Sequence, residues 1–357
     1  MRSTPRASEL IEIFPAVAYA LAIRHGGDAA ADAARRLVAE GAPLRAVAGA
    51  LGLPMWLRRL PPEAFTTDLC DLPHEEAFAR RVPARLPARA VEAADWLEAI
   101  RFASRAADTD FALWIARHRL HNRASVHCER LVLLASYAWH STNPAHPASD
   151  LVWARWRPEM APDTAICAAK SWFNRVLLCV RMPPGRALDP WLAPGAADGL
   201  AFVPLCDSDS VLREARAMRN CADQYAMPLI NGRCRLFSVR RGEQHVATLE
   251  VIAHSREQGV LTIGQLKGPG NAPAPLDIWQ AALRWLAAQP RLLQMPPIAP
   301  QPPVDALAWH DLLAPYRRQR GGAPWLPVVP EAAALADIEA GLAGLARDAN
   351  IRSWLFL

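Results

Sequence analysis

Apolar residues recur at three- and four-residue spacing along the first half of the chain, which is the spacing of one face of an α-helix. This pattern predicts helices over residues 28–40, 43–51, 55–60, 91–106, 111–120, 129–140 and 163–180. Gly41, Gly52 and the Pro61-Pro62 pair follow three of them and are typical of helix ends. Residues 1–182 are therefore interpreted as a helical domain.

The pattern changes after residue 182. Proline and glycine cluster over residues 183–200, which predicts a linker. A helix with an apolar stripe is predicted over residues 208–223. Three strand-like runs and a second helix follow at 233–240, 245–252, 260–267 and 276–289. Residues 201–290 are thus predicted to form a helix, a three-stranded antiparallel meander and a helix.

The last part of the chain is rich in proline, with ten prolines between positions 290 and 330. Proline fixes φ and lacks a backbone donor, so this stretch is predicted to be extended chain wrapped over the C-terminal domain. A final helix is predicted over residues 331–348. Residues 291–357 are therefore interpreted as a Pro-rich tail with a terminal helix, and the expected fold class is α+β.

The amino-acid composition excludes some classes of protein. The chain has 357 residues, of which 52% are hydrophobic, so it can bury a sizeable core and is not disordered throughout. No run approaches the roughly 18 apolar residues of a membrane span. The formal charge is +5, but only Lys170 and Lys267 are lysines. An Arg- and Ala-rich, Lys-poor chain is typical of a GC-rich genome, so the charge is weak evidence for nucleic acid.

The seven cysteines are widely spaced, odd in number and without a Cys-x-x-Cys motif. They indicate neither a disulfide framework nor a structural zinc site, and no metal is predicted. Residues 10–22 resemble a signal peptide, but Glu12 and Pro15 interrupt the apolar run. We therefore expect a cytoplasmic protein with reduced cysteines, and nothing in the sequence specifies a cofactor or an oligomeric state.

Polar residues of the kinds that form sites gather within about sixty positions of the predicted C-terminal domain. Residues i and i+2 of a strand share a face, so Thr248 and Glu250 lie together, as do Gln265 and Lys267. In a meander the two pairs become cross-strand neighbours, and Arg235 joins them if the register allows. Glu250 is then either half of a structural ion pair with Arg235 or Lys267, or a general base or cation ligand.

Cys221 is the other candidate for chemistry. It lies near the end of the predicted helix 208–223, where the helix dipole opposes a thiolate. A nucleophilic Cys221 also needs a base, and His245 and His254 are the nearby histidines. The alternative is a packed or hydrogen-bonded cysteine. Residues 268–271 are interpreted as a tight turn, with Asn271 capping the next helix.

Several of these residues occur in a specific order after the predicted helix: Cys221, Tyr225, Gly232, Thr248, Glu250, Gln265, Gly268 and Asn271. This order resembles that of the PcfJ-like domain family, over roughly residues 200–290. The family often has histidine where this chain has Asn220, which disfavours a His/Cys metal or catalytic pair. The resemblance implies a domain and a conjugative-plasmid context, and it implies no particular reaction.

The leading hypothesis is a bacterial binding protein whose partner is a nucleic acid or a protein from a mobile-element or chromosome-maintenance setting. The expected binding residues are Arg219, Asn220, Tyr225, Arg235, Thr248, Gln265, Lys267 and Asn271. The alternative is an enzyme with a polar groove around Cys221, Arg235, Glu250, Gln265 and Asn271, in which Cys221 and Glu250 are the catalytic candidates. A second alternative is a scaffold without a small-molecule site.

These hypotheses predict different structures. An enzyme brings its candidate residues to one concave face, whereas a scaffold buries Glu250 in an ion pair with no pocket beside it. A nucleic-acid binding module has a continuous arginine-rich face. Its candidate residues are Arg58, Arg59, Arg213, Arg216, Arg240 and Arg241. The first two lie in residues 44–60, which resemble a helix-turn-helix but equally suit a helical packing unit.

Overall fold

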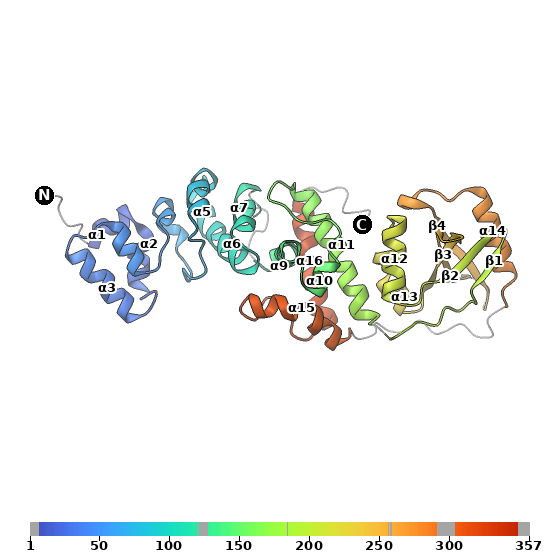
Figure 1. Ribbon diagram of the computed structural model, residues 1–357. Helices are drawn as coiled ribbons and strands as arrows, with labels where there is room; N and C mark the ends of the chain where they lie inside the picture. The colour runs from blue at the N-terminus through green and yellow to red at the C-terminus, as the bar shows by residue number, and fades with distance from the viewer. Residues whose placement is uncertain are drawn as a thin grey trace.

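The computed structural model describes residues 7–118, 120, 128–183, 185–255, 257, 259–290 and 304–348. Within these residues the fold is α+β, with one five-stranded antiparallel sheet and many helices. Figure 1 shows an elongated arrangement, with the N-terminal helices at one end and the sheet at the other. None of the described helices is long and apolar enough to cross a membrane.

The first half of the described chain is helical. Its α-helices are α1 (Ala7–Ile13), α2 (Pro15–Ala22), α3 (Asp28–Ala39), α4 (Leu44–Ala50), α5 (Glu76–Arg81), α6 (Ala93–Ala106), α7 (Thr109–His118), α9 (Val132–Thr142), α10 (Pro147–Asp150) and α11 (Pro162–Arg181). Short 3-10 turns lie between them, at η1 (Met55–Arg59), η2 (Pro62–Ala64), η3 (Val82–Arg85), η4 (Ala90–Glu92) and η5 (Cys128–Leu131). The predicted helices are present, and the one predicted over 55–60 is the 3-10 turn η1.

The C-terminal stretch differs from the prediction. Residues expected to be extended contain α15 (Ala306–Gln319), and the last predicted helix is α16 (Ala332–Asp348). Only Pro315 falls within α15, so the intervening residues are free to form helical hydrogen bonds. Asp305 begins that helix by accepting a hydrogen bond from the Ala308 backbone N–H. Residues 291–303 and 349–357 of the predicted tail lie outside the described residues.

Both C-terminal helices pack against the helical half of the chain instead of wrapping over the sheet. Trp309 and Tyr316 of α15 are buried in the same apolar core as the N-terminal helices, and the Tyr316 hydroxyl donates to the Ala106 carbonyl at 2.8 Å. Leu335 and Leu342 of α16 join that core. Figure 1 shows both helices beside α9–α11. The predicted wrap over the C-terminal domain is therefore wrong for these helices.

The sheet has five described strands in sequence order, not the predicted three. They are β1 (Gly195–Ala197), β2 (Leu200–Pro204), β3 (Cys234–Arg241), β4 (Gln244–Ala253) and β5 (Leu261–Lys267). The additional hairpin begins within the predicted linker. Asp198 and Gly199 form its two-residue turn with φ of 49° and 72°. An Asp-Gly pair suits a turn that needs positive φ at both positions.

Helices cover both faces of the sheet. On one face α14 (Leu276–Ala287) inserts Trp285, which stacks on Phe202 with ring centroids 4.7 Å apart. The other face packs against α12 (Ser208–Met218), α13 (Ala226–Ile230) and the end of α11. This second face looks toward the helical half of the molecule (Figure 1).

Candidate functional site

The strand register confirms the predicted cross-strand neighbours. Thr248 of β4 lies opposite Lys267 of β5, and Glu250 lies opposite Gln265. A bulge directly after Glu250 shifts the pairing. Arg235 lies opposite Val251, a core residue of the α14 face, whereas its neighbour Leu236 lies opposite Glu250. The polar side chains therefore share the α12 face, and Arg235 points away from them because successive strand residues alternate.

The inner pocket is a small hollow on the α12 face, with a volume of about 20 Å³. Its size is that of a single water molecule. Eight of the ten sequence-predicted site residues line it: Asn220, Cys221, Tyr225, Thr248, Glu250, Gln265, Lys267 and Asn271. Four of the five groove residues of the enzyme hypothesis are thus brought together, and Arg235 is not among them.

Asn220 and Asn271 fix Cys221 at the mouth of this pocket. The Asn220 side chain accepts from the Ala222 backbone N–H at 3.1 Å and so begins the 3-10 turn η6 (Cys221–Gln224). Asn271 adopts φ of 63°, a region that asparagine tolerates, and its Oδ1 accepts from the Cys221 N–H at 3.4 Å and thiol at 3.5 Å. Asn271 therefore braces Cys221 and does not cap α14, which begins after Pro275.

Glu250 is the unusual carboxylate of the inner pocket. Burial raises its pKa, while a hydrogen bond from the buried Cys234 thiol opposes that shift. In the described part of the chain no cation lies within 4.0 Å of it, so neither predicted ion pair forms. Gly264 on β5 leaves it room, because a Cβ there would lie 2.8 Å from Glu250 Oε2. A carboxylate whose pKa is raised is a stronger proton acceptor than an ordinary glutamate.

Cys221 lacks the surroundings of a nucleophile. Burial raises the pKa of its thiol, which keeps it protonated at neutral pH. No histidine is among the residues that line the inner pocket. His245, one of the two predicted bases, contacts Glu214 instead. Burial and the charge of Glu250 also raise the pKa of Tyr225, so this pocket holds protonated sulfur and phenol donors beside one carboxyl group.

The cationic cleft is a larger hollow of about 780 Å³ that adjoins the inner pocket and shares Asn220, Cys221 and Asn271 with it. One wall comes from α11 and the segment before it, and the other from α12 and η6. Its characteristic residues are Trp153, Arg175, Arg216, Arg219 and Asp223. The site thus lies where the helical half of the chain meets the sheet-bearing half.

The charges of the cationic cleft do not cancel. Buried Arg175 pairs with Asp223 at 2.8 Å and donates to the Leu151 carbonyl at 2.7 Å. Burial raises the pKa of Asp223, and Arg175 opposes that shift. Arg216 and Arg219 are exposed, and no carboxylate of the described chain lies within 4.0 Å of either. The three lining arginines and one lining aspartate leave two positive charges.

Trp153 supplies an apolar surface beside two of the arginines. The guanidinium carbon of Arg175 lies 4.2 Å from its ring centroid, and that of Arg216 lies 5.1 Å away. Such cation–π contacts hold an arginine in place while its N–H groups remain free to donate. The half-buried indole and the two uncompensated arginines together form a surface for a ligand with an anionic and a flat part.

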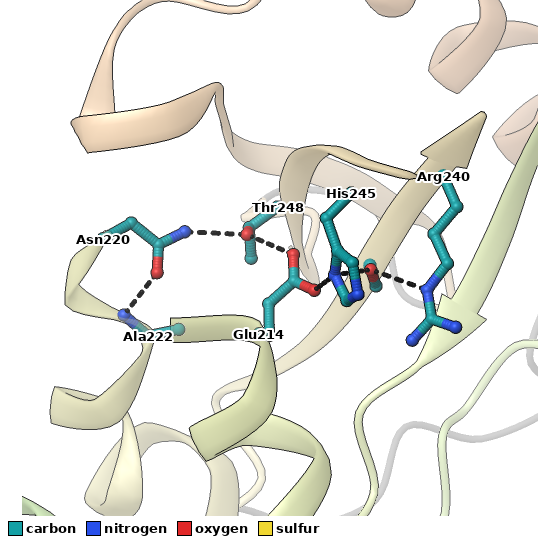
Figure 2. Close-up of polar contacts among 7 residues, drawn as sticks. Glu214, Asn220, Ala222, Arg240, His245 and Thr248 are labelled. Atoms are coloured by element: carbon teal, nitrogen blue, oxygen red, sulfur yellow. Dashed lines mark hydrogen bonds and ion pairs between the residues drawn. The ribbon is translucent and has the colours of Figure 1, made fainter. Parts of the chain in front are cut away.

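A buried polar network supports the site from behind, as Figure 2 shows. The Asn220 amide donates to Thr248 Oγ1 at 2.7 Å, and the Thr248 hydroxyl donates to Glu214 Oε1 at 2.6 Å. Glu214 of α12 is completely buried, and His245 Nδ1 lies 2.5 Å from its Oε2. This chain of hydrogen bonds ties α12 and β4 to Asn220, and therefore to the turn that carries Cys221.

Ser238, His245 and Glu214 do not form a catalytic triad. Ser238 Oγ and Glu214 Oε2 both approach the same nitrogen, Nδ1 of His245, at 3.1 and 2.5 Å. A triad needs the serine and the acid on opposite ring nitrogens. Ser238 is also fully buried, so no substrate can reach its hydroxyl. The group is structural.

Arg235 has a structural role away from the inner pocket. Its guanidinium donates to the carbonyls of Leu229 at 2.9 Å, of Cys234 at 2.8 Å and of Asp189, and lies 4.4 Å from the Trp191 ring centroid. It therefore anchors the segment before β1 to the sheet.

The predicted arginine face is not continuous. Arg58 and Arg59 lie in η1, which packs near α2 at the far end of the molecule from α12 (Figure 1). Arg241 pairs with Asp277 at 3.2 Å, and Arg240 donates to Ser238. The cleft instead uses Arg216, Arg219 and a residue that sequence reasoning missed, Arg175. Trp153 and Glu214 were also missed as site or support residues, because no local pattern marks them.

Comparisons of the chain with models of known protein families, with curated proteins and with solved structures returned no match.

Proposed function

We propose that this chain is a cytoplasmic binding protein of the PcfJ-like type whose cationic cleft takes single-stranded nucleic acid. The observation that carries the proposal is the pair of uncompensated arginines, Arg216 and Arg219, beside the half-buried Trp153 in a hollow of about 780 Å³. Guanidinium groups match phosphate oxygens in geometry, and an aromatic ring stacks on an unpaired base.

A single strand fits this surface better than a duplex. The bases of a duplex are stacked inside it, whereas an unpaired base can enter a concave hollow and meet an indole. A reducing compartment agrees with the cysteines Cys70, Cys167, Cys179, Cys206, Cys221 and Cys234, all of which are free. The PcfJ-like resemblance supplies the mobile-element context of the proposal.

The test is fluorescence anisotropy of a labelled oligonucleotide, single-stranded or duplex, titrated with the full chain over a range of salt concentrations. With two phosphates neutralised, the logarithm of the binding constant should fall with the logarithm of salt at a slope of about −1.4. Arg216→Ala and Trp153→Ala should each weaken binding about tenfold. Arg80→Ala, which removes an exposed arginine from the end of α5, is the matched control and should bind like wild type.

Binding that is absent, insensitive to salt or equally tight for the duplex would overturn the proposal. So would equal losses in Arg216→Ala and Arg80→Ala. Recovery of a protein partner that requires Arg216, with no binding of oligonucleotide, would support a protein-binding module in its place.

Arg219 offers a test in which stability and binding move in opposite directions. It ends α12 with φ of 50° and ψ of 43°, a left-handed conformation that favours glycine. Arg219→Gly should therefore stabilise the fold by about 1 kcal/mol in urea unfolding, yet weaken oligonucleotide binding about tenfold. Arg219→Ala should lose the same affinity without the gain in stability. A variant that binds normally would remove Arg219 from the site.

A second candidate function is an enzyme that uses the inner pocket. The favouring observation is that Cys221, Glu250, Gln265 and Asn271 line one hollow next to the cleft, with the pKa of Glu250 raised by burial. Mass spectrometry of nucleotides and oligonucleotides incubated with the chain should then show a product. Glu250→Gln should abolish turnover and retain binding. Products formed equally by Glu250→Gln would exclude Glu250 as the base.

A further inference from the structure

We propose that His25, Asp68 and Cys70 form a zinc-binding site in the N-terminal helical region, independent of the cationic cleft. His25 lies in the turn between α2 and α3, and the other two lie in the segment between η2 and α5. One potential ligand atom from each residue lies within 4.8 Å of the other two. His25 Nδ1 and Asp68 Oδ1 are 3.5 Å apart.

The distances suit a tetrahedral ion. Zinc binds histidine nitrogen, carboxylate oxygen and thiolate sulfur at about 2.0–2.3 Å, which places neighbouring ligand atoms roughly 3.3–3.8 Å apart. The separation of His25 and Asp68 already falls in this range. Cys70 and Asp68 are exposed, so a small side-chain rotation can bring all three atoms onto one ion. The mixed nitrogen, oxygen and sulfur donor set favours zinc over magnesium or calcium.

The surroundings hold one ligand and leave the others accessible. The His25 side chain is only 10% exposed, so packing fixes its ring, whereas the Asp68 side chain is 54% exposed and open to an ion from solvent. The Cys70 backbone N–H donates to Asp68 Oδ1 at 3.1 Å and holds the two residues in one turn. Three protein ligands leave a fourth position for water or an external ligand, as in zinc sites that bind substrates.

The charge balance also agrees with a divalent ion. A carboxylate and a thiolate together neutralise Zn²⁺, so the bound site carries no net charge. The trio escapes sequence analysis because His25 is distant in sequence from the other two. Only the fold brings the two segments together, and no motif of fixed spacing marks them in the sequence.

The experiment titrates the metal-free full chain with Co²⁺, which occupies zinc sites and reports its ligands by absorption. Wild type should show a sulfur-to-cobalt charge-transfer band and tetrahedral d–d bands at one equivalent, and Zn²⁺ should displace them. Cys70→Ser should lose the charge-transfer band. Asp68→Asn and His25→Gln should each weaken Co²⁺ binding at least tenfold. Cys206→Ser is the control and should keep the wild-type spectrum.

Thermal unfolding gives a second measurement. Zn²⁺ should raise the Tm of wild type and of Cys206→Ser, because a ligand that binds only the folded state stabilises it. It should leave the Tm of Cys70→Ser unchanged, and circular dichroism verifies that this variant is folded. A charge-transfer band that survives in Cys70→Ser, or Co²⁺ binding without that band in wild type, would overturn the proposal.

Discussion

Two carboxylates face the same side of the sheet, and they differ in every respect that matters for function. Glu214 comes from α12, is completely buried, and is bound by the Thr248 hydroxyl and His245 Nδ1. Glu250 comes from β4, only two residues from Thr248, and is partly buried with one weak thiol donor, Cys234. The first carboxylate is fully partnered, and the second is not.

This difference distinguishes Glu214, which supports the fold, from Glu250, which borders the candidate site. A buried carboxylate persists only when its desolvation is offset by hydrogen bonds, and Glu214 meets that condition without reference to any ligand. Glu250 borders the inner pocket and has its pKa raised by burial. A ligand or a proton can therefore supply the partner that its carboxylate lacks. This contrast also weighs against the scaffold hypothesis, which required Glu250 in a buried ion pair.

Removing the partnered carboxylate should have the largest effect on stability. Glu214→Ala leaves Thr248 and His245 without their acceptor and opens a cavity at a completely buried position. We expect a loss of about 3 kcal/mol in urea unfolding. Glu243→Ala, at an exposed position before β4, should change stability by less than about 0.5 kcal/mol. A loss below about 1 kcal/mol for Glu214→Ala would show that the network is not a structural support.

Breaking the hydrogen-bonded link between Asn220 and Glu214 should have an intermediate effect on stability. Thr248→Val keeps the side-chain shape but removes the hydroxyl that joins Asn220 to Glu214. Stability should fall by about 1–2 kcal/mol, and oligonucleotide affinity should fall as well because the turn at Asn220 loses its brace. Thr248→Ser retains the hydroxyl and should retain the affinity. Equal losses of affinity in both variants would contradict the bracing role.

Neutralising the under-partnered carboxylate should have the smallest effect, with a distinctive pH dependence. The folded state binds the Glu250 proton more tightly than the unfolded state, so ionisation costs stability as pH rises through the raised pKa. Glu250→Gln has no such cost. Relative to wild type, the variant should therefore become more stable between pH 4 and pH 8, as measured by urea unfolding at each pH. A difference that shrinks with rising pH would reverse the sign of the assigned shift.

Local patterns in the sequence predicted much of the fold and part of the site. Helical periodicity located the main helices, and the period-2 rule placed Thr248 beside Lys267 and Glu250 beside Gln265 once the meander was assumed. These inferences succeed because they depend on backbone geometry over a few residues. The β1–β2 hairpin was missed because its three- and five-residue strands are too short to show alternation.

Contacts between residues that are distant in the sequence could not be predicted. Arg235 was misplaced because a change of one residue in a strand moves a side chain to the other face. Arg175 and Trp153 reach the site from α11 and the segment before it, and no periodicity marks which residue of a helix meets a distant partner. Glu214 is on the neighbouring helix α12, but its partners are on β4. The residues of α15 were wrongly predicted to be extended, because the number of prolines was considered without their positions in the stretch.

Helix α11 belongs to both halves of the molecule at once. Trp172 and Val176 lie in the core shared with the N-terminal and C-terminal helices, whereas Leu178 and Met182 lie in the core between α12 and the sheet. Arg175, on the same helix, is the counter-ion of Asp223. A fragment that begins at residue 183 therefore loses part of its apolar core and leaves the buried carboxylate of Asp223 without its counter-ion. The two halves are therefore expected to fold as one unit, and the cleft between them needs residues from both.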